Sequence, residues 1–310
     1  MSDTLDIVAL GEPLLELSQL PGTTRFEQGY GGDTSNAAVA AARQGARVAY
    51  VTRVGADIFG EMFRRMWQQE GIDVCGVQSD PTAHTGVYFI THEGGEHTFS
   101  YLRAGSAASR MRPEDVPLDL VRRAAYLHVS GISQAISPNA CDAVFRAVEV
   151  ARQAGVRVSY DPNLRLTLWP LARAGAVTLA TAALADFFLP SIEDARALSG
   201  FDTPESIVRW AHELLEVPVV ALKLGPKGVL VSDGHQRELV PGFKVASVDA
   251  TGAGDCFDGA FLARLAAGDT IWDAARYANA AAALATTGYG AIDPLPRPEA
   301  VRTLLATIQD

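Results

Sequence analysis

Residues 249–255 read Asp249-Ala250-Thr251-Gly252-Ala253-Gly254-Asp255 and precede an apolar helical pattern that runs from Cys256 to Leu265. This run puts small residues and one carboxylate at the start of a helix, where unpaired amides and the helix dipole favour an anion. Its two glycines leave the backbone exposed, so the turn can form a concave nest of N–H donors. The final aspartate stands where a carboxylate could accept a proton from an attacking hydroxyl. The run therefore favours a phosphoryl-transfer site over an ordinary capped helix.

Two better-known phosphate-binding motifs do not occur in the sequence. A P-loop requires Gly-x-x-x-x-Gly-Lys followed by Ser or Thr, and no segment has that pattern. The dinucleotide fingerprint would need a third glycine where Phe257 stands. The sequence therefore disfavours a P-loop NTPase and a Rossmann dehydrogenase.

The run resembles the C-terminal signature of the PfkB, or ribokinase-like, carbohydrate kinases, Asp-Thr-x-Gly-Ala-Gly-Asp-x-Phe-x-x-Gly. The chain carries Ala250 where threonine is usual and has Gly259 near the last position. The family's N-terminal signature is matched by Gly31, Gly32, Asn36, Ala37, Ala38, Ala41 and Gly45. The resemblance implies that Asp255 is the catalytic base and that the amides of Gly252, Ala253 and Gly254 form the anion hole.

Strand-like and helical patterns alternate along most of the chain, which predicts a mainly parallel sheet with helices on both faces. The resemblance implies the same α/β, ribokinase-like fold as a single domain over 1–310. The predicted strands are 6–10, 48–52, 126–130, 156–160, 187–189, 219–222, 228–232 and 244–248, the last two antiparallel near the sheet edge. The predicted helices are 35–44, 59–70, 138–153, 171–184, 254–267, 272–285 and 298–308.

Two β-rich segments, 87–91 and 97–102, interrupt this alternation, with a hairpin turn at Gly94-Gly95 between them. They predict a small antiparallel β lid inserted from about 12–30 and 86–103. We expect the lid to lie over the strand ends, where ligands of α/β proteins usually bind.

Within the lid, Phe99, Tyr101 and Arg103 alternate and therefore share one face of their strand. A tyrosine and an arginine can hydrogen-bond sugar hydroxyls and bind a carboxylate, and Tyr88 on the partner strand could join them. A solvated sheet face would show the same pattern. The continuation Tyr-x-Arg-Ala-Gly-Ser-Ala-Ala resembles the 2-keto-3-deoxygluconate kinase branch of the family.

The strand over 156–160 is followed by Asp161-Pro162-Asn163-Leu164-Arg165, at the end of the sheet where ligands bind. The family shares Asp-x-Asn-x-Arg here. The resemblance implies that Arg165 contacts the substrate and the transferring phosphate, with Asn163 nearby. A simple turn is the structural alternative.

The family's Asn-x-x-Glu element, which helps to organise magnesium and phosphate, is represented by Ser191 and Asp194. Aspartate still supplies a carboxylate that can hold hydrated Mg²⁺, although Ser191 could simply cap a helix. Asp249 and Thr251 could contribute to a monovalent-cation site, as in some relatives. The expected cofactors are therefore ATP and Mg²⁺, with K⁺ at that further site.

The segment 223–228 matches the family's nucleotide-binding turn, in which Gly225 and Gly228 let the backbone approach the nucleotide. Lys223 could meet phosphate there. Asn279 resembles a position beside the adenine, although its alanine-rich helix could equally be a packing helix.

The expected activity is ATP-dependent phosphorylation of 2-keto-3-deoxygluconate to 2-keto-3-deoxy-6-phosphogluconate. Gly32 and Asn36 are expected to contact sugar hydroxyls. The keto-acid is expected to be framed by Tyr88, Tyr101, Arg103 and Arg165. A fructokinase or ribokinase with the same machinery is one alternative. A catalytically silent sugar or nucleotide sensor is another.

Composition excludes several other classes of protein. A net charge of −10 over 310 residues disfavours nucleic-acid binding. No apolar run approaches the roughly 20 residues that span a bilayer, and the start Met1-Ser2-Asp3-Thr4 lacks the basic residues of a signal peptide, so we expect a cytoplasmic protein without a membrane partner. Three cysteines without close spacing suggest neither a disulfide framework nor a cysteine-rich metal site. Apolar residues on the predicted lid suggest a homo-oligomer.

Overall fold

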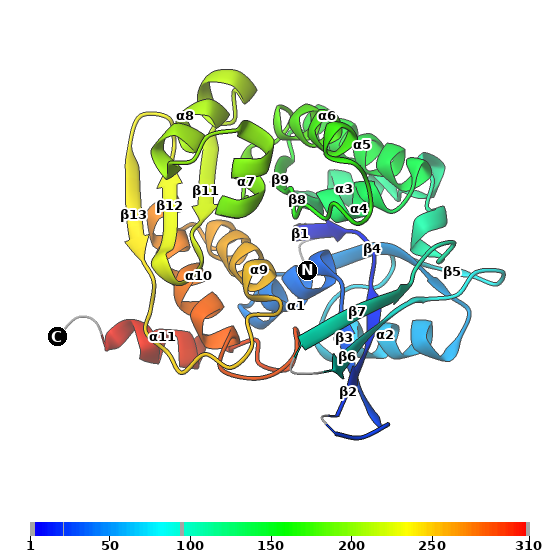
Figure 1. Ribbon diagram of the computed structural model, residues 1–310. Coiled ribbons are helices and arrows are strands. Elements are labelled where there is room, and N and C mark those ends of the chain that lie inside the picture. Colours follow the sequence, from blue (N-terminus) through cyan, green and yellow to red (C-terminus); the bar gives the residue numbers. More distant parts are fainter. Residues whose placement is uncertain (1–3, 21, 94–95, 308–310) are drawn as a thin grey trace.

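The main sheet has nine strands in the order β13-β12-β11-β10-β9-β8-β1-β4-β5 (Figure 1). The computed structural model describes residues 4–20, 22–93 and 96–307. Neighbouring strands from β11 to β5 in this order are parallel, whereas β12 and β13 are antiparallel. The strands are Leu5–Leu10 (β1), Val48–Gly55 (β4), Val77–Asp80 (β5), Ala124–Ser130 (β8), Arg157–Asp161 (β9), Phe187–Phe188 (β10), Val219–Lys223 (β11), Gly228–Ser232 (β12) and Arg237–Pro241 (β13). The predicted mainly parallel sheet is confirmed.

Helices cover both faces of this sheet, because successive residues of its buried strands point to opposite sides. In β1, Ile7 and Ala9 join one apolar cluster, and Val8 and Leu10 join the other. The first cluster includes α1 (Asp33–Arg43), α2 (Ile58–Gln69), α9 (Ala253–Ala266), α10 (Ile271–Ala285) and α11 (Pro298–Ala306). The second includes α3 (Leu118–Arg122), α5 (Pro138–Gln153), α6 (Leu171–Ala182), α7 (Ile192–Ser199) and α8 (Pro204–Leu215). The short helix α4 (Gly131–Ala135) follows β8, and three 3-10 turns span Ala108–Arg110 (η1), Pro113–Asp115 (η2) and Gly225–Lys227 (η3).

The lid is a separate four-stranded sheet in the order β3-β2-β6-β7. Its strands are Leu14–Gln19 (β2), Phe26–Gly31 (β3), Gly86–Glu93 (β6) and Glu96–Leu102 (β7). The pairs β2/β3 and β6/β7 are antiparallel, as predicted, and the two hairpins meet in a parallel pair between β2 and β6. The predicted turn at Gly94-Gly95 lies outside the described residues. Since β2 begins four residues after β1 ends, the lid starts at the carboxyl end of the main sheet.

One predicted strand is wrong. Residues 244–248 have no strand, and the edge of the sheet is β13 at 237–241. The carboxylate of Asp233 accepts hydrogen bonds from the amides of His235 and Gln236, so the chain reverses directly after β12. The later segment is left without a neighbouring strand, and Val248 is 50% exposed. Helices α7 and α8 and strand β5 were not predicted from the sequence.

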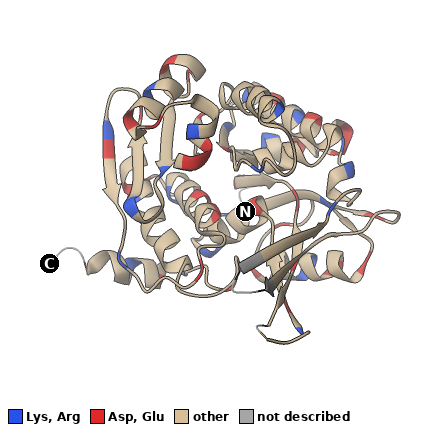
Figure 2. Cartoon of the chain, in the orientation of Figure 1, with Lys and Arg blue, Asp and Glu red and all other residues tan. Residues whose placement is uncertain are grey.

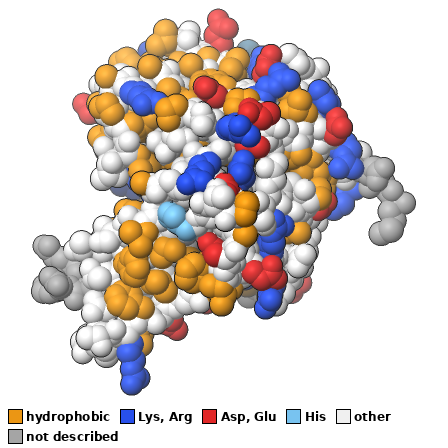
Figure 3. Space-filling view, turned by 90° about the vertical axis from the view of Figure 1, so that its right-hand side faces the viewer, with side chains coloured by type: hydrophobic (Ala, Val, Ile, Leu, Met, Phe, Trp, Pro, Cys, Tyr) orange, Lys and Arg blue, Asp and Glu red, His pale blue; other side chains and the backbone are white. Residues whose placement is uncertain are grey.

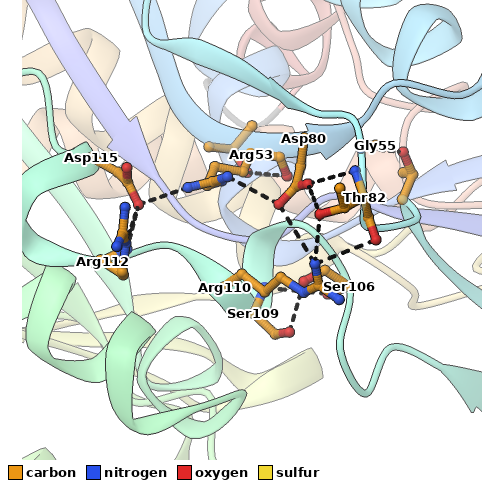
Figure 4. A network of polar contacts seen from close by, with 11 residues as sticks. Arg53, Gly55, Asp80, Thr82, Ser106, Ser109, Arg110, Arg112 and Asp115 are labelled. Atoms are coloured by element: carbon orange, nitrogen blue, oxygen red, sulfur yellow. Dashed lines mark hydrogen bonds and ion pairs between the residues drawn. The ribbon is translucent and has the colours of Figure 1, made fainter.

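An arginine of the main sheet joins the two segments that connect the β6–β7 hairpin of the lid to the core (Figure 4). Arg53 on β4 pairs with Asp80, at the end of β5, at 3.0 Å and with Asp115, after the lid, at 2.8 Å. Arg110 lies 4.0 Å from the same Asp80 carboxylate, and Arg112 pairs with Asp115 at 3.5 Å. The network therefore links the segment that enters β6 with the segment that leaves β7.

Replacing Arg53 with alanine is expected to lower the free energy of unfolding by about 2 kcal/mol, because it leaves two little-exposed carboxylates without their shared partner. Denaturant unfolding followed by circular dichroism measures this change. The control is Arg65→Ala, which removes an exposed i,i+4 pair with Glu61 and should cost about 0.5 kcal/mol or less. Equal losses in the two variants would contradict a stabilising role for the network.

The surface carries acidic and basic residues interspersed on the outer helices (Figure 2). Figure 3 shows hydrophobic side chains gathered on the lower part of the molecule, where the lid lies. Exposed apolar residues of the lid are Phe26, Phe99, Tyr101 and Leu102. The homo-oligomer stays a prediction. Within the described ranges, none of the helices has the length and apolar character required to span a bilayer.

Candidate active site

The two signature motifs meet through their helices. Asn36, on α1, donates a hydrogen bond from Nδ2 to Oδ2 of Asp255, on the first turn of α9, at 2.8 Å. Helices α1 and α9 can approach this closely because Gly259 has no side chain: a Cβ there would lie 2.1 Å from the carbonyl oxygen of Ala37. Segments 219 residues apart in the sequence thus form one polar site.

The environment of Asp255 gives it the acid–base properties of a general base. Burial raises the pKa of Asp255 to about 7, and the neighbouring carboxylates of Asp33 and Asp161 act in the same direction. The hydrogen bond from Asn36 and the charge of Lys223 oppose this increase in the pKa. A carboxylate whose pKa is near neutrality is partly ionised and still basic enough to take a proton from an alcohol.

Of the three amides predicted to form the anion hole, those of Gly252 and Gly254 have no acceptor among the described residues, and that of Ala253 is engaged. Gly252 adopts a left-handed conformation with φ of 73° and caps α9. The amide of Ala253 donates to the carbonyl of Ala250 at 3.2 Å. The amides of Gly252, Gly254 and Asp255 have no hydrogen-bond acceptor among the described residues. These three donors at a helix N-terminus can bind an anion.

The residues predicted to contact the sugar lie at the start of α1. Gly32 has φ of 105°, and a Cβ there would lie 2.4 Å from the carbonyl oxygen of Glu12, so only glycine fits. Oδ1 of Asn36 is buried without a hydrogen-bond partner in the described part of the chain, which leaves an acceptor for a hydroxyl beside the candidate base. Asn163 donates from Nδ2 to Oδ2 of Asp33 at 3.1 Å, so Asn163 joins this side of the site.

Sequence reasoning did not single out Asp33. It is a buried carboxylate that directly follows the Gly-Gly pair, and its charge acts on Asp255. Its pKa is raised, first by burial and also by the charge of Asp161. The signal that could have identified it is an acidic residue at the first position of an otherwise apolar, small-residue helix.

The lid brings its predicted residues together, but the polar groups of Tyr88 and Arg103 already have partners. Tyr88 stacks on Tyr101 with ring centroids 5.9 Å apart, and its hydroxyl donates to the carboxylate of Glu16. Arg103 donates from Nε to Oε2 of Glu12 at 3.0 Å and from Nη2 to the same oxygen. Only Nη1 of the Arg103 guanidinium lacks a hydrogen-bond partner among the residues described. The carboxylate clamp predicted for Arg103 would therefore have to use that remaining edge.

Glu12 is a second residue that sequence reasoning missed. It follows the end of β1, its side chain is fully buried, and it accepts a further hydrogen bond from the Ser106 hydroxyl at 2.8 Å. Arg103 and Ser106 both follow the last lid strand. Glu12 therefore joins the lid to the carboxyl end of the main sheet.

On the predicted nucleotide side, two side chains make structural contacts. Ser191 caps α7 by accepting a hydrogen bond from the amide of Asp194 at 3.1 Å, which is the alternative left open by the sequence. Asn279 donates from Nδ2 to the carbonyl of Pro241 at 2.7 Å. Gly228 is required for backbone packing, because a Cβ there would lie 2.0 Å from the carbonyl oxygen of Val240. Nucleotide contacts for Ser191, Asn279, Gly225 and Gly228 stay predictions.

Two other predicted residues, Lys223 and Arg165, lie around this region. Lys223 is held by Asp161 at 2.9 Å and by Asp258 at 3.0 Å, so its ammonium group already has two carboxylate partners. Arg165 is exposed and donates from Nη1 to the carbonyl of Leu164 at 3.0 Å. Its charge nevertheless acts on the buried carboxylates of Asp33 and Asp194.

Of the residues predicted to organise Mg²⁺, Asp194 supplies a carboxylate that could bind the ion. Burial raises the pKa of Asp194 to about 6, with a contribution from the charge of Asp161. Within residues 4–20, 22–93 and 96–307, no group of three or more His, Cys, Asp and Glu could hold a metal ion. Asp194 could thus hold Mg²⁺ only if water and nucleotide phosphates supplied most of the ligands, which is usual for this ion.

The predicted monovalent-cation residues order the loop before α9. The Asp249 carboxylate accepts hydrogen bonds from the amide and the hydroxyl of Thr251, at 2.9 and 2.7 Å. It also accepts one from the amide of Gly290 at 2.9 Å. A cation site at Asp249 and Thr251 stays a prediction.

Known proteins match this sequence along nearly the whole chain. Residues 6–298 match the pfkB family carbohydrate kinase. The sequence is 35% identical over 321 residues to fructokinase-2 of Solanum habrochaites, covering 96% of this chain and 95% of the relative. It is also 35% identical over 314 residues to 2-dehydro-3-deoxygluconokinase of Thermoproteus tenax, covering 98% of this chain and 95% of the relative.

A solved structure agrees as well. Fructokinase from Vibrio cholerae O395, with fructose, ADP and calcium ion bound, superposes with a TM-score of 0.89 at 31% identity, covering 98% of this chain and all of the other. Relatives that act on different sugars are thus equally similar, so the comparisons identify a family and leave the sugar open. Matching signatures, fold and length together show that the chain belongs to the pfkB family of carbohydrate kinases and is a sugar kinase.

Proposed function

We propose that the chain catalyses the ATP-dependent phosphorylation of 2-keto-3-deoxygluconate to 2-keto-3-deoxy-6-phosphogluconate. The observation that carries the kinase reaction is the position of Asp255, half-buried beside Asn36 and next to three amides at the start of α9 that have no acceptor among the described residues. The keto-acid is favoured by Arg103 and Arg165 and by the resemblance of the lid sequence to that branch of the family. The relative from Thermoproteus tenax supports the same substrate.

The reaction follows from these groups. Asp255 takes the proton of the terminal hydroxyl while the hydroxyl oxygen forms its bond to the γ-phosphorus and the bond to the leaving ADP oxygen breaks. Asn36 orients the base through its amide and can accept a hydrogen bond from the sugar at Oδ1. The amides of Gly252, Gly254 and Asp255 stabilise the charge on the transferring phosphoryl group. Bound Mg²⁺ would neutralise phosphate charge, and Asp194 is the carboxylate that would hold it.

A fructokinase is the second candidate, and one contact favours it. The guanidinium of Arg103 is paired with the buried carboxylate of Glu12, so its positive charge is already compensated within the protein. A neutral sugar needs no further cation. Phosphorylation assays with 2-keto-3-deoxygluconate, 2-keto-3-deoxygalactonate, fructose and ribose separate the candidates, and fructose or ribose turned over far better than both keto-acids would overturn the proposed substrate.

Replacing Arg103 with alanine is expected to lower kcat/KM for the keto-acid about 100-fold and for fructose about tenfold or less, because only the keto-acid offers a carboxylate to the guanidinium. Steady-state kinetics with both sugars measures the difference. Arg25→Ala, an exposed arginine at the tip of the same lid, is the matched control and should leave both values near wild type. Equal losses with both sugars would assign Arg103 to holding the lid through Glu12.

A further inference from the structure

A buried group of one lysine and two aspartates lies directly beneath the candidate active site. Nζ of Lys223, at the end of β11, lies 2.9 Å from Asp161, at the end of β9, and 3.0 and 3.1 Å from the two carboxylate oxygens of Asp258, on α9. The side chains of Lys223, Asp161 and Asp258 are 13%, 7% and 1% exposed. The group connects α9, which carries Asp255, with the ends of β9 and β11, near which other predicted site residues lie.

The lysine is also close to the backbone of the anion hole. A methyl group added at Gly254 would lie 3.6 Å from Nζ of Lys223. All hydrogen bonds of this ammonium group within the described chain go to the two aspartates, so its donors are already engaged. The sequence had suggested a direct phosphate contact for Lys223, and this geometry suggests a different role.

We propose that Lys223 is a positioning residue that acts through Asp161 and Asp258, holding α9 against the ends of β9 and β11 and placing a fixed positive charge beneath the base, rather than a ligand of the nucleotide phosphates. The inference rests on the proposed role of Asp255 as the base. It concerns a side chain that the proposed reaction does not otherwise use.

The charges within the group support this role. Burial raises the pKa of Asp258, whereas Lys223 lowers the pKa of Asp161 against the effect of burial. Burial alone would lower the pKa of Lys223, but the two carboxylates raise it. The group therefore favours a charged lysine and an ionised Asp161, while burial favours the neutral form of Asp258. In that state the net charge of the group is close to zero.

The pKa of Asp255 depends on this group and on the other neighbours of Asp255. The groups that face Asp255 are Asp33 and Asn36 on α1, Asp161, Lys223, Tyr88 on the lid and Cys256 on its own helix. Among these described residues Lys223 supplies the positive charge, and it lowers the pKa of Asp255. Removing its charge while Asp161 stays ionised should therefore make Asp255 harder to ionise.

The test is the pH dependence of kcat/KM in Lys223→Gln, which keeps hydrogen-bond donors but removes the charge. In the wild-type enzyme kcat/KM should fall as the pH drops below about 7, where Asp255 becomes protonated. In Lys223→Gln this acid limb is expected to move up by about one pH unit, while the KM for ATP changes less than about threefold. Lys223→Arg should return the limb toward the wild-type position. An unmoved limb with a KM for ATP raised tenfold or more would show a phosphate ligand and overturn the inference.

Asp258→Asn is the matched control, because the raised pKa of Asp258 favours the neutral form that asparagine mimics, so the acid limb should stay within about 0.3 pH units. If Lys223→Gln does not fold, the double variant Lys223→Gln/Asp161→Asn removes both charges together. It should keep the wild-type acid limb and the KM for ATP, whereas a raised KM for ATP would again contradict the inference. Failure of the proposed function is seen separately, as turnover that survives in Asp255→Asn.

Discussion

Asp255→Asn is expected to lower kcat by about 10²- to 10⁴-fold, because asparagine cannot take the proton of the attacking hydroxyl. Binding of ATP and of the sugar, measured by calorimetry, should persist, since the amides at the start of α9 are unchanged. Asp142→Asn, on the exposed side of α5, is a control for the same chemical change away from the site and should retain full activity. Turnover above about a tenth of wild type in Asp255→Asn would rule out the proposed base.

Stability gives a second measurement on the same variant. Burial and the neighbouring Asp33 and Asp161 oppose ionisation of Asp255, so a neutral asparagine should raise the melting temperature at pH 8. Loss of activity together with higher stability would exclude misfolding as the cause. It would also exclude a silent sensor as the native function, because a sensor has no turnover to lose.

Gly259→Ala is expected to lower the free energy of unfolding by about 3 kcal/mol or more. Its Cβ would lie 2.1 Å from the carbonyl oxygen of Ala37 and 2.8 Å from Cβ of Ala40, so α1 and α9 would have to separate. Because these helices carry Asn36 and Asp255, the folded fraction should also lose kcat. Denaturant unfolding and steady-state kinetics measure the two effects.

Gly175→Ala provides the matched control, since Gly175 also lies within a helix, α6, and a Cβ there meets no atom within 4 Å. The alanine should raise the free energy of unfolding by about 0.5 to 1 kcal/mol, the usual difference between alanine and glycine in a helix. If both variants gained stability, the proposed close contact between α1 and α9 would be incorrect.

Much of the fold was predictable because local signals were strong. Helix α5 has its predicted bounds of 138–153, since Ser137 caps it and Pro138 suits its first turn. The prediction of a strand at 244–248 is wrong because it did not take account of the turn at Asp233. That turn reverses the chain directly after β12, so that residues 237–241 form the edge strand. Helix α8 has similar signals in Thr203 and Pro204, and these could have been used.

Within the site, the backbone conformation of the small residues was predicted correctly, whereas the contacts of the long side chains were not. The small residues before α9 form a turn with unpartnered amides, as their sizes indicate. In contrast, Lys223, Arg103 and Tyr88 were predicted to meet ligands, and each instead reaches a carboxylate 62, 91 or 72 residues away in the chain. No pattern around these three residues identifies those partners.

By itself, the sequence determined the alternation of strands and helices, the glycine-rich start of α9 and the presence of a carboxylate there, because these depend on side-chain size, periodicity and backbone freedom over a few residues. Only the tertiary structure decided that Asp255 is hydrogen-bonded to Asn36, that Lys223 is held by Asp161 and Asp258, and that Arg103 is held by Glu12. Burial and ion pairing depend on which strand ends and helices become neighbours. That order is set by packing across the whole sheet.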